Sequence, residues 1–303
     1  MTITSRANGK ETSTMKYRLL TLAISIGLCT TANAAMRHYN APIESSQWVL
    51  KTDSKLQCAL EHNVPGYGVA IFSSVASKQL NMLFDLDMKL LPKHFDTAAV
   101  YSVPPSWMPG KAQRKIADMT LRAQYDGDLP EKVAWTMLSE LEKGFRPTLH
   151  YQDWYNDNDK VVVSLNASNF YDTYTAFTDC ITNLLPYSFE DIAYTVLTYE
   201  SNSIDLTRYS QKQLNRIGEY LKADNNLELV LVDGYSDAYG ARYKNQQLSV
   251  ERAETIKGYF VEMGVEGNRI DVTGHGERRH ISPNDTPEAR AKNRRVVVQL
   301  SRS

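Results

Sequence analysis

The second half of the chain contains a strand pattern, a polar loop and a helix pattern in immediate succession, and this segment constrains the fold most. Residues 227–232 form an apolar, strand-like run, and residues 249–263 show apolar side chains at helical spacing. Ser249 is a suitable N-cap for that helix. Residues 234–253, which read GYSDAYGARYKNQQLSVERA, join the two patterns. The segment predicts a strand-loop-helix unit.

Two charged residues in this unit are candidates for a binding site. Asp237 is expected on the loop just after the strand, and Arg252 in the first turn of the helix. A carboxylate can bind an ammonium group, and a guanidinium can bind a carboxylate through two parallel hydrogen bonds. The pair therefore suits a zwitterionic ligand. Taken singly, Asp237 could be a turn cap and Arg252 a surface charge.

The elements around this unit alternate between strands and helices. Expected helices cover residues 206–221 and 249–263, and a short helix begins at Thr286-Pro287-Glu288, a cap followed by proline and an acid. Expected strands cover residues 192–198, 227–232, 270–273 and 296–300. This order predicts an α/β sandwich, with a domain boundary near residues 186–191.

The first half of the chain shows mostly strand patterns. Residues 80–88 alternate, with Leu80, Met82, Phe84, Leu86 and Met88 on one face. Further expected strands cover residues 67–72, 98–103 and 161–165, and helices cover residues 130–143 and 167–185. These strands are expected to be antiparallel with one solvated face. The chain is therefore predicted to be an α+β two-domain protein, with a leader at 1–34, a β-rich domain with a few helices at 35–188 and the α/β sandwich at 189–303.

The N-terminus has the pattern of a secretory signal peptide. Lys16 and Arg18 form a basic flank, residues 19–28 are apolar, and residues 32–34 (Ala-Asn-Ala) form a small-residue cleavage site. Cleavage after Ala34 would deliver the chain to the periplasm. Ten apolar residues are too few for a retained membrane anchor, because a span needs about 20. Residues 1–14 are polar and read as an upstream start or an added extension.

The three cysteines fit an exported protein. Cys29 lies in the leader after Leu28, whereas a lipoprotein signal needs a small residue before its cysteine. Cys58 and Cys180 remain in the mature chain, where an oxidising compartment favours a disulfide. Two buried free thiols are the alternative.

Composition narrows the classes of partner. The chain of 303 residues has a formal charge of −1, which is unfavourable for binding nucleic acid by bulk electrostatics. Beyond the leader, no apolar run is long enough to cross a membrane. The six histidines are scattered and no H-E-x-x-H spacing occurs, so no metal site, cofactor or catalytic residue is expected.

Four ordered motifs in residues 190–301 resemble those of OmpA-like domains. The loop and helix resemble the family pattern G-H-x-D-x-x-G…N-x-x-L-S-x-x-R-A, and three further motifs follow: residues 274–277 (G-x-G-E), 284–286 (N-x-T) and 293–296 (N-R-R-V). Tyr235, His280 and Ala289 depart from the family's usual histidine, proline and glycine.

The resemblance implies a ligand and a set of binding residues. In such domains the ligand is the diaminopimelate residue of the peptidoglycan stem peptide. By resemblance, Asp237 would hold its amino group and Arg252 its carboxylate, while Asn245 and Arg295 would line the same pocket. Arg294 is expected to be a surface or ion-pair residue.

The combination of a cleaved signal, a β-rich domain, two cysteines and an OmpA-like tail resembles the periplasmic T-ring family of sodium-driven polar flagellar motors. This resemblance implies that the N-terminal domain docks on the basal body and on the ring partner MotX, and that the protein helps to position and anchor stator units. A generic periplasmic wall anchor is the alternative. A cell-wall hydrolase is a third reading, which a metal or nucleophile cluster would support; Cys58 or Cys180 would be catalytic only as a free thiol.

Overall fold

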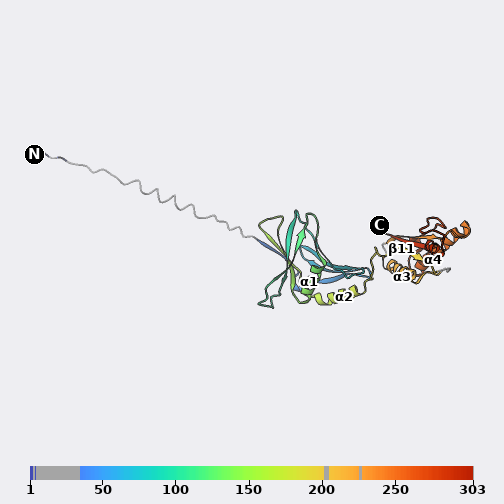
Figure 1. Ribbon diagram of the computed structural model, residues 1–303. Coiled ribbons are helices and arrows are strands. Elements are labelled where there is room, and N and C mark those ends of the chain that lie inside the picture. The colour runs from blue at the N-terminus through green and yellow to red at the C-terminus, as the bar shows by residue number, and fades with distance from the viewer. Residues whose placement is uncertain (3, 5–34, 201–204, 225–226, 303) are drawn as a thin grey trace.

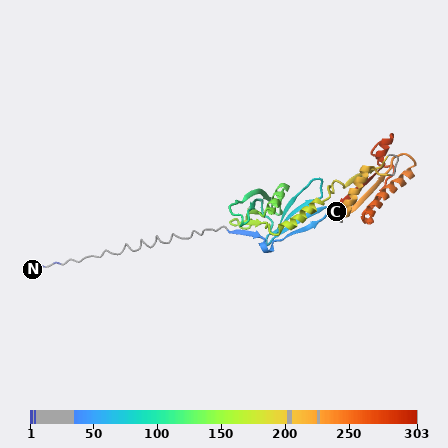
Figure 2. The same ribbon diagram turned by 90° about the horizontal axis from the view of Figure 1, so that it is seen from below.

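The computed structural model describes residues 1–2, 4, 35–200, 205–224 and 227–302. The expected leader core, Cys29 and the cleavage point at Ala34 lie outside the described residues. Two bodies with separate apolar cores lie end to end in both views (Figures 1 and 2). Within the described ranges, no helix has the length and apolar character needed to cross a membrane.

The first body contains two five-stranded sheets and two helices. One sheet has the order β1 (Met36–Asn40), β10 (Lys160–Ser164), β9 (Arg146–Gln152), β6 (Asp96–Val103) and β7 (Arg114–Leu121). The other has the order β2 (Trp48–Asp53), β3 (Gln57–Val64), β4 (Gly68–Val75), β5 (Leu83–Met88) and β8 (Gly127–Leu129). The helices are α1 (Glu131–Glu142) and α2 (Phe170–Thr182), and a short 3-10 turn covers Ile43–Ser45. The prediction of a β-rich domain with a few helices is confirmed.

Most strand pairs of this body are antiparallel, as predicted, but one is not. β1 pairs with β10 in parallel, which the sequence patterns did not indicate. In β5 the predicted alternation is correct, because Phe84, Leu86 and Met88 are buried while the residues between them are exposed. The disulfide Cys58–Cys180 joins β3 to α2 with a Cα–Cα distance of 6.0 Å. It connects segments that lie 122 positions apart in the sequence and so ties the start of this body to its end.

The second body is a four-stranded sheet covered by helices. The strand order is β11 (Tyr194–Thr198), β14 (Arg295–Arg302), β12 (Leu227–Tyr235) and β13 (Ile270–Gly274), with only the β12–β13 pair parallel. The helices are α3 (Arg208–Ala223), α4 (Arg242–Glu262) and α5 (Pro287–Asn293), and a 3-10 turn covers Gly267–Arg269. The predicted order of elements is confirmed, including the Thr286 cap, whose side chain accepts from the Ala289 N–H.

Helices α3 and α4 pack on one face of this sheet. Their apolar side chains, including Leu214, Ile217, Ile256 and Phe260, share a buried core with the inward residues of β12 and β14. Gly234 lets α4 come close to the sheet, because a Cβ at this position would lie 1.9 Å from the Ser249 carbonyl oxygen. The end of β12 is therefore pressed against α4.

The start of α4 differs from the prediction. The helix begins at Arg242 after the N-cap residue Ala241, so Ser249 is an internal residue and Arg252 is well beyond the first turn. The Ser249 hydroxyl donates to the Gln246 carbonyl at 2.7 Å and accepts from the Gly276 N–H at 2.9 Å. The added turns are polar and are held by tertiary contacts rather than by an apolar stripe.

The two bodies meet around residues 185–191. The Leu185 N–H donates to the Lys55 carbonyl at 2.9 Å, and Lys78 forms an ion pair with Asp191. Ala76, which follows β4 of the first body, is buried in the core of the second. These contacts supplement the covalent link between the two bodies.

Candidate functional site

Asp237 lies on the loop directly after β12, as predicted. The Ser236 N–H donates to the Gly276 carbonyl at 2.8 Å, which fixes the chain just before the aspartate. One Asp237 carboxylate oxygen accepts from the Tyr239 N–H at 3.0 Å, and the other forms an ion pair with Arg294 at 2.9 Å. The Asp237 side chain is 13% exposed. The carboxylate is thus oriented and mostly buried, with a small part of its surface open to solvent.

Arg252 projects from α4 into the same region and is incompletely satisfied. The side chain is buried, its Nη1 donates to the Tyr235 carbonyl at 3.4 Å, and its guanidinium carbon lies 4.8 Å from the centre of the Tyr199 ring. Its Nε is buried without a hydrogen-bond partner among the described residues. A buried donor without a partner is costly. The guanidinium therefore has unused capacity for an acceptor.

Burial lowers the pKa of Arg252, and its charged neighbours act on it in opposite directions. Arg294 lowers this pKa further, while Tyr199 and Asp237 raise it. Asp237, Arg252 and Arg294 thus lie within electrostatic range of one another. Because the group contains one acid and two bases, it has one positive charge in excess. Such a group can bind an ammonium at Asp237 and a carboxylate at the guanidinium groups.

Asn245 is buried in the second turn of α4, near the same loop. Its Nδ2 donates to Glu277 of the G-x-G-E segment at 3.1 Å. Gly240 adopts φ +98°, and a Cβ there would lie 3.9 Å from the Asn245 Oδ1. Asn245 therefore connects the helix to the G-x-G-E segment.

The Arg295 side chain has different partners from the Arg294 side chain. Its Nη2 donates to the Arg279 carbonyl at 3.1 Å, and its guanidinium carbon lies 3.9 Å from the centre of the Tyr235 ring. The next residue, Val296, points into the core beneath the helices, so Arg295 lies on the opposite face of the sheet. The structure brings Arg294, rather than Arg295, to Asp237. Arg294 was expected only as a surface or ion-pair residue.

His275 lies on the same sheet face as Arg295. Its ring stacks on Tyr235 with centroids 4.8 Å apart, and its Nε2 lies 2.8 Å from an Asp233 carboxylate oxygen. Tyr235 is thus packed between His275 and Arg295, which fits a structural role for the histidine.

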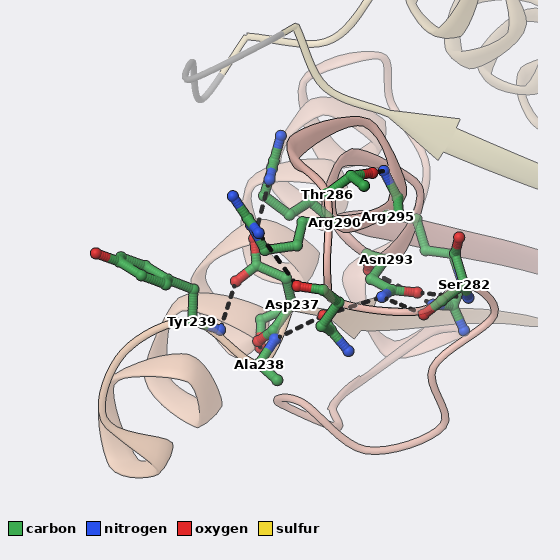
Figure 3. A network of polar contacts seen from close by, with 12 residues as sticks. Asp237, Ala238, Tyr239, Ser282, Thr286, Arg290, Asn293 and Arg295 are labelled. Carbon is green, nitrogen blue, oxygen red and sulfur yellow. Dashed lines mark hydrogen bonds and ion pairs between the residues drawn. The ribbon is translucent and has the colours of Figure 1, made fainter.

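An amide network centred on buried Asn293 supports the Asp237 loop (Figure 3). The Ala238 N–H donates to the Asn284 side-chain oxygen at 3.0 Å, and that oxygen also accepts from Asn293 at 3.1 Å. The Asn293 side chain accepts from the Ile281 and Ser282 N–H groups and donates to the Ser282 carbonyl. The N-x-T and N-R-R motifs therefore hold the loop that carries the carboxylate. The sequence motifs contain these asparagines but did not indicate their role, and no sequence pattern indicated Tyr199.

Both domains match known protein families. Residues 39–186 match the MotY N-terminal domain, and residues 198–294 match the OmpA family. A relative from Vibrio parahaemolyticus, named sodium-type flagellar protein MotY, is 40% identical over 95% of this chain and 99% of its own length. The chain is therefore a two-domain protein with an OmpA-family domain at its C-terminal end. It belongs to the MotY family.

Other relatives match only the C-terminal domain. The peptidoglycan-binding protein ArfA of Mycobacterium tuberculosis is 42% identical over 29% of this chain and 27% of its own length. The periplasmic domain of Helicobacter pylori MotB aligns with 35% of this chain and 68% of that domain, at 25% identity and a TM-score of 0.30.

Proposed function

We propose that this protein is a non-enzymatic structural component of the periplasmic T ring of the flagellar motor and anchors the motor to peptidoglycan. The C-terminal domain binds the diaminopimelate residue of the stem peptide through Asp237 and Arg252, with Asn245 beside them. The observation that carries this proposal is the buried Arg252 guanidinium, whose Nε lacks a partner among the described residues and lies in the same group as the partly exposed Asp237.

Binding would rearrange the charges of the site. A ligand ammonium would share Asp237 with Arg294 or displace it, and the released guanidinium would join Arg252 in binding the ligand carboxylate. Charge-assisted hydrogen bonds of this kind are about twice as strong as neutral ones. Arg295 would position the site indirectly, since it packs on Tyr235, whose carbonyl accepts from Arg252.

The N-terminal domain is proposed to dock on the basal body and on MotX, so that the ring positions and anchors stator units. The name of the Vibrio relative supports a role in the flagellar motor, and the separate cores of the two bodies support a division of labour between them. Linking two binding domains makes the second contact intramolecular and raises the overall avidity. The protein would act in the periplasm after cleavage of its leader behind Ala34.

Sacculus binding by single variants tests the site. Asp237→Ala and Arg252→Ala should each lose most binding to purified sacculi while keeping the fold. Asp271→Ala is the matched control, because Asp271 is an exposed acid on β13, away from the Asp237 loop. Unchanged sedimentation of either site variant with sacculi would refute the assignment.

Localisation of a tagged copy tests the role in the motor. Polar foci are expected in cells with a basal body and should disappear in cells that lack it. Foci that persist without the basal body would favour the generic wall anchor. Release of muropeptides from sacculi by the purified protein would instead support the hypothesis of a cell-wall hydrolase. The Cys58–Cys180 bond leaves neither cysteine as a free nucleophile.

A further inference from the structure

Two buried carboxylates in the N-terminal domain share one cation. Asp153 and Asp159 lie at the two ends of the turn between β9 and β10, and their side chains are 5% and 10% exposed. Arg37 of β1 reaches both, with Nη1 3.0 Å from Asp153 Oδ2 and Nη2 3.1 Å from Asp159 Oδ2. Among the described residues, no other cation forms an ion pair with either aspartate, and Asp153 Oδ2 lacks an aligned hydrogen bond. The cluster therefore has one formal negative charge in excess, which is costly at buried positions.

The parallel pairing of β1 with β10 places Ala35 beside Asp159. Met36 is opposite Lys160 in this ladder, so the residues that precede the two strands also meet. The Ala35 N–H donates to Asp159 Oδ1 at 3.2 Å, and the Ala35 carbonyl accepts from the Lys160 N–H at 3.0 Å. The Ala35 nitrogen is thus directed at the Asp159 oxygen that Arg37 does not use.

The two partners of this contact differ in how firmly they are held. The Asp159 carbonyl accepts from the Asp153 N–H at 2.9 Å and from Gln152 Nε2 at 2.7 Å, so the turn that carries the carboxylate is fixed. β1 is the edge strand of its sheet, and all its residues except Tyr39 are exposed. Because this strand buries little apolar surface, its attachment depends on the ladder and on the contacts at its ends.

We propose that removal of the leader completes this site, because the new α-ammonium group of Ala35 binds Asp159 and fastens β1 to β10. The proposal rests on cleavage behind Ala34, which is part of the proposed function. Hydrolysis of the bond between Ala34 and Ala35 by a leader-removing protease consumes one water, and leaves a carboxylate on Ala34 and an ammonium on Ala35. A free α-amino group is mostly protonated at neutral pH. Charge-assisted donors then replace the amide N–H, and the cluster becomes formally neutral.

The N-terminal domain would thus gain two constraints that depend on export. The Cys58–Cys180 disulfide joins β3 of one sheet to α2, and such bonds persist in an oxidising compartment. The ion pair at Ala35 would join β1 to β10 of the other sheet. A chain that keeps its leader lacks this ion pair, so its β1 edge should open more readily.

Hydrogen exchange of β1 tests the role of the new charge. The mature chain from Ala35 to Ser303 is prepared with a free α-amine and with an acetylated one, which keeps an N–H and removes the charge. The amides of residues 36–40, followed by mass spectrometry, should exchange about tenfold more slowly with the free amine, because the ion pair suppresses local opening. In Asp159→Asn the two forms should exchange at the same rate. Equal rates for the two forms of the unaltered sequence would overturn the ion pair.

Asp118→Asn is the matched control, since Asp118 lies on β7 at the other edge of the same sheet and forms an exposed ion pair with Lys115. This variant should keep the difference between the free and acetylated forms. A difference that survives in Asp159→Asn would show that the ammonium binds elsewhere, and would overturn the site.

The mass of the protein isolated from the periplasm separates the ion pair from the processing step. A first residue other than Ala35 would overturn the proposed cleavage and the ion pair together. A first residue of Ala35 combined with equal exchange rates would overturn the ion pair alone. Binding of a diaminopimelate-containing stem tripeptide, which tests the proposed wall contact, is independent of both results.

Discussion

Two clusters in this protein each combine one carboxylate with two basic side chains, and they differ in how completely the charges are satisfied. In the N-terminal domain, buried Glu140 of α1 accepts from the Ser102 hydroxyl and pairs with Arg114 and Lys143, each at 3.1 Å. Burial alone would raise the pKa of Glu140, but these three partners together lower it. Both bases are more than half exposed, so the carboxylate is the buried partner and is fully bonded.

In the C-terminal domain the arrangement is reversed. Arg252 is the buried partner, its pKa is lowered by burial, and one of its donors is unfilled. Charged groups that hold a fold together are paired in the free protein, whereas charges that bind a ligand are left partly unpaired until it arrives. The comparison therefore assigns the Glu140 cluster to the scaffold and the Asp237–Arg252–Arg294 group to binding.

The largest expected effect is on ligand binding by Arg252→Met. Affinity for the stem tripeptide should fall about a hundredfold or more, because the ligand carboxylate would lose its buried partner. The free energy of unfolding should change by less than about 1 kcal/mol, since loss of the bond to Tyr235 is offset by removal of a desolvated charge. Calorimetric titration and urea denaturation measure the two quantities. Arg114→Met is the matched control and should leave tripeptide affinity unchanged. A large loss of stability in Arg252→Met would place Arg252 in the scaffold.

Glu140→Ala should show the opposite behaviour. Removing the carboxylate leaves Ser102 without its acceptor and two cations without their shared anion, so the protein should be destabilised by about 1–3 kcal/mol. Tripeptide affinity should stay at the wild-type value. A variant of wild-type stability, measured by urea denaturation, would show that the Glu140 cluster contributes nothing to the scaffold.

A smaller effect is expected from pH, and it should act on the scaffold alone. Buried His62 has Nδ1 2.9 Å from the Gln47 carbonyl and accepts from the Asn166 N–H at Nε2, so the fold requires the neutral ring. Burial lowers its pKa in the folded state. Below about pH 6.5 the unfolded chain therefore binds a proton that the folded chain does not. As the pH is lowered through this range, the free energy of unfolding should decrease by at most about 1.4 kcal/mol per pH unit for this group.

Denaturation at pH 5.5 and 7.5 measures this dependence, to which His150 adds in the same direction because burial lowers its pKa too. His62→Gln should weaken the dependence, whereas His94→Gln, at an exposed position, should not. If His62→Gln shows the same pH dependence of stability as the wild type, His62 does not cause that dependence.

Much of the C-terminal domain could be predicted because local patterns and tertiary contacts agree there. The end of β12, the Asp237 loop and the Thr286 cap follow from strand composition and capping chemistry. The start of α4 was missed because its first turns are stabilised by contacts with residues distant in sequence, such as Asn245 with Glu277. The two adjacent arginines show a second limit of prediction from sequence, which is the direction of a side chain at the start of a strand. Arg294 and Arg295 differ by one position, but side chains at the start of a strand alternate between faces.

The N-terminal domain was predicted only in outline. β3 carries Glu61 and His62 within a largely buried strand, so it shows no clean alternation. The parallel β1–β10 pair joins segments more than a hundred residues apart, which no local pattern can reveal. The cysteine pair was the exception, because its chemistry is independent of periodicity.

The central claim is that the unfilled Nε of Arg252 receives the ligand carboxylate. Its Nε–H resonance can be followed by nitrogen-15 NMR during titration with the stem tripeptide, with Arg252→Lys used to assign the signal. The account predicts a large shift of this resonance and slower solvent exchange of its proton at saturation. An unchanged Arg252 resonance in a protein that has bound the tripeptide would contradict it.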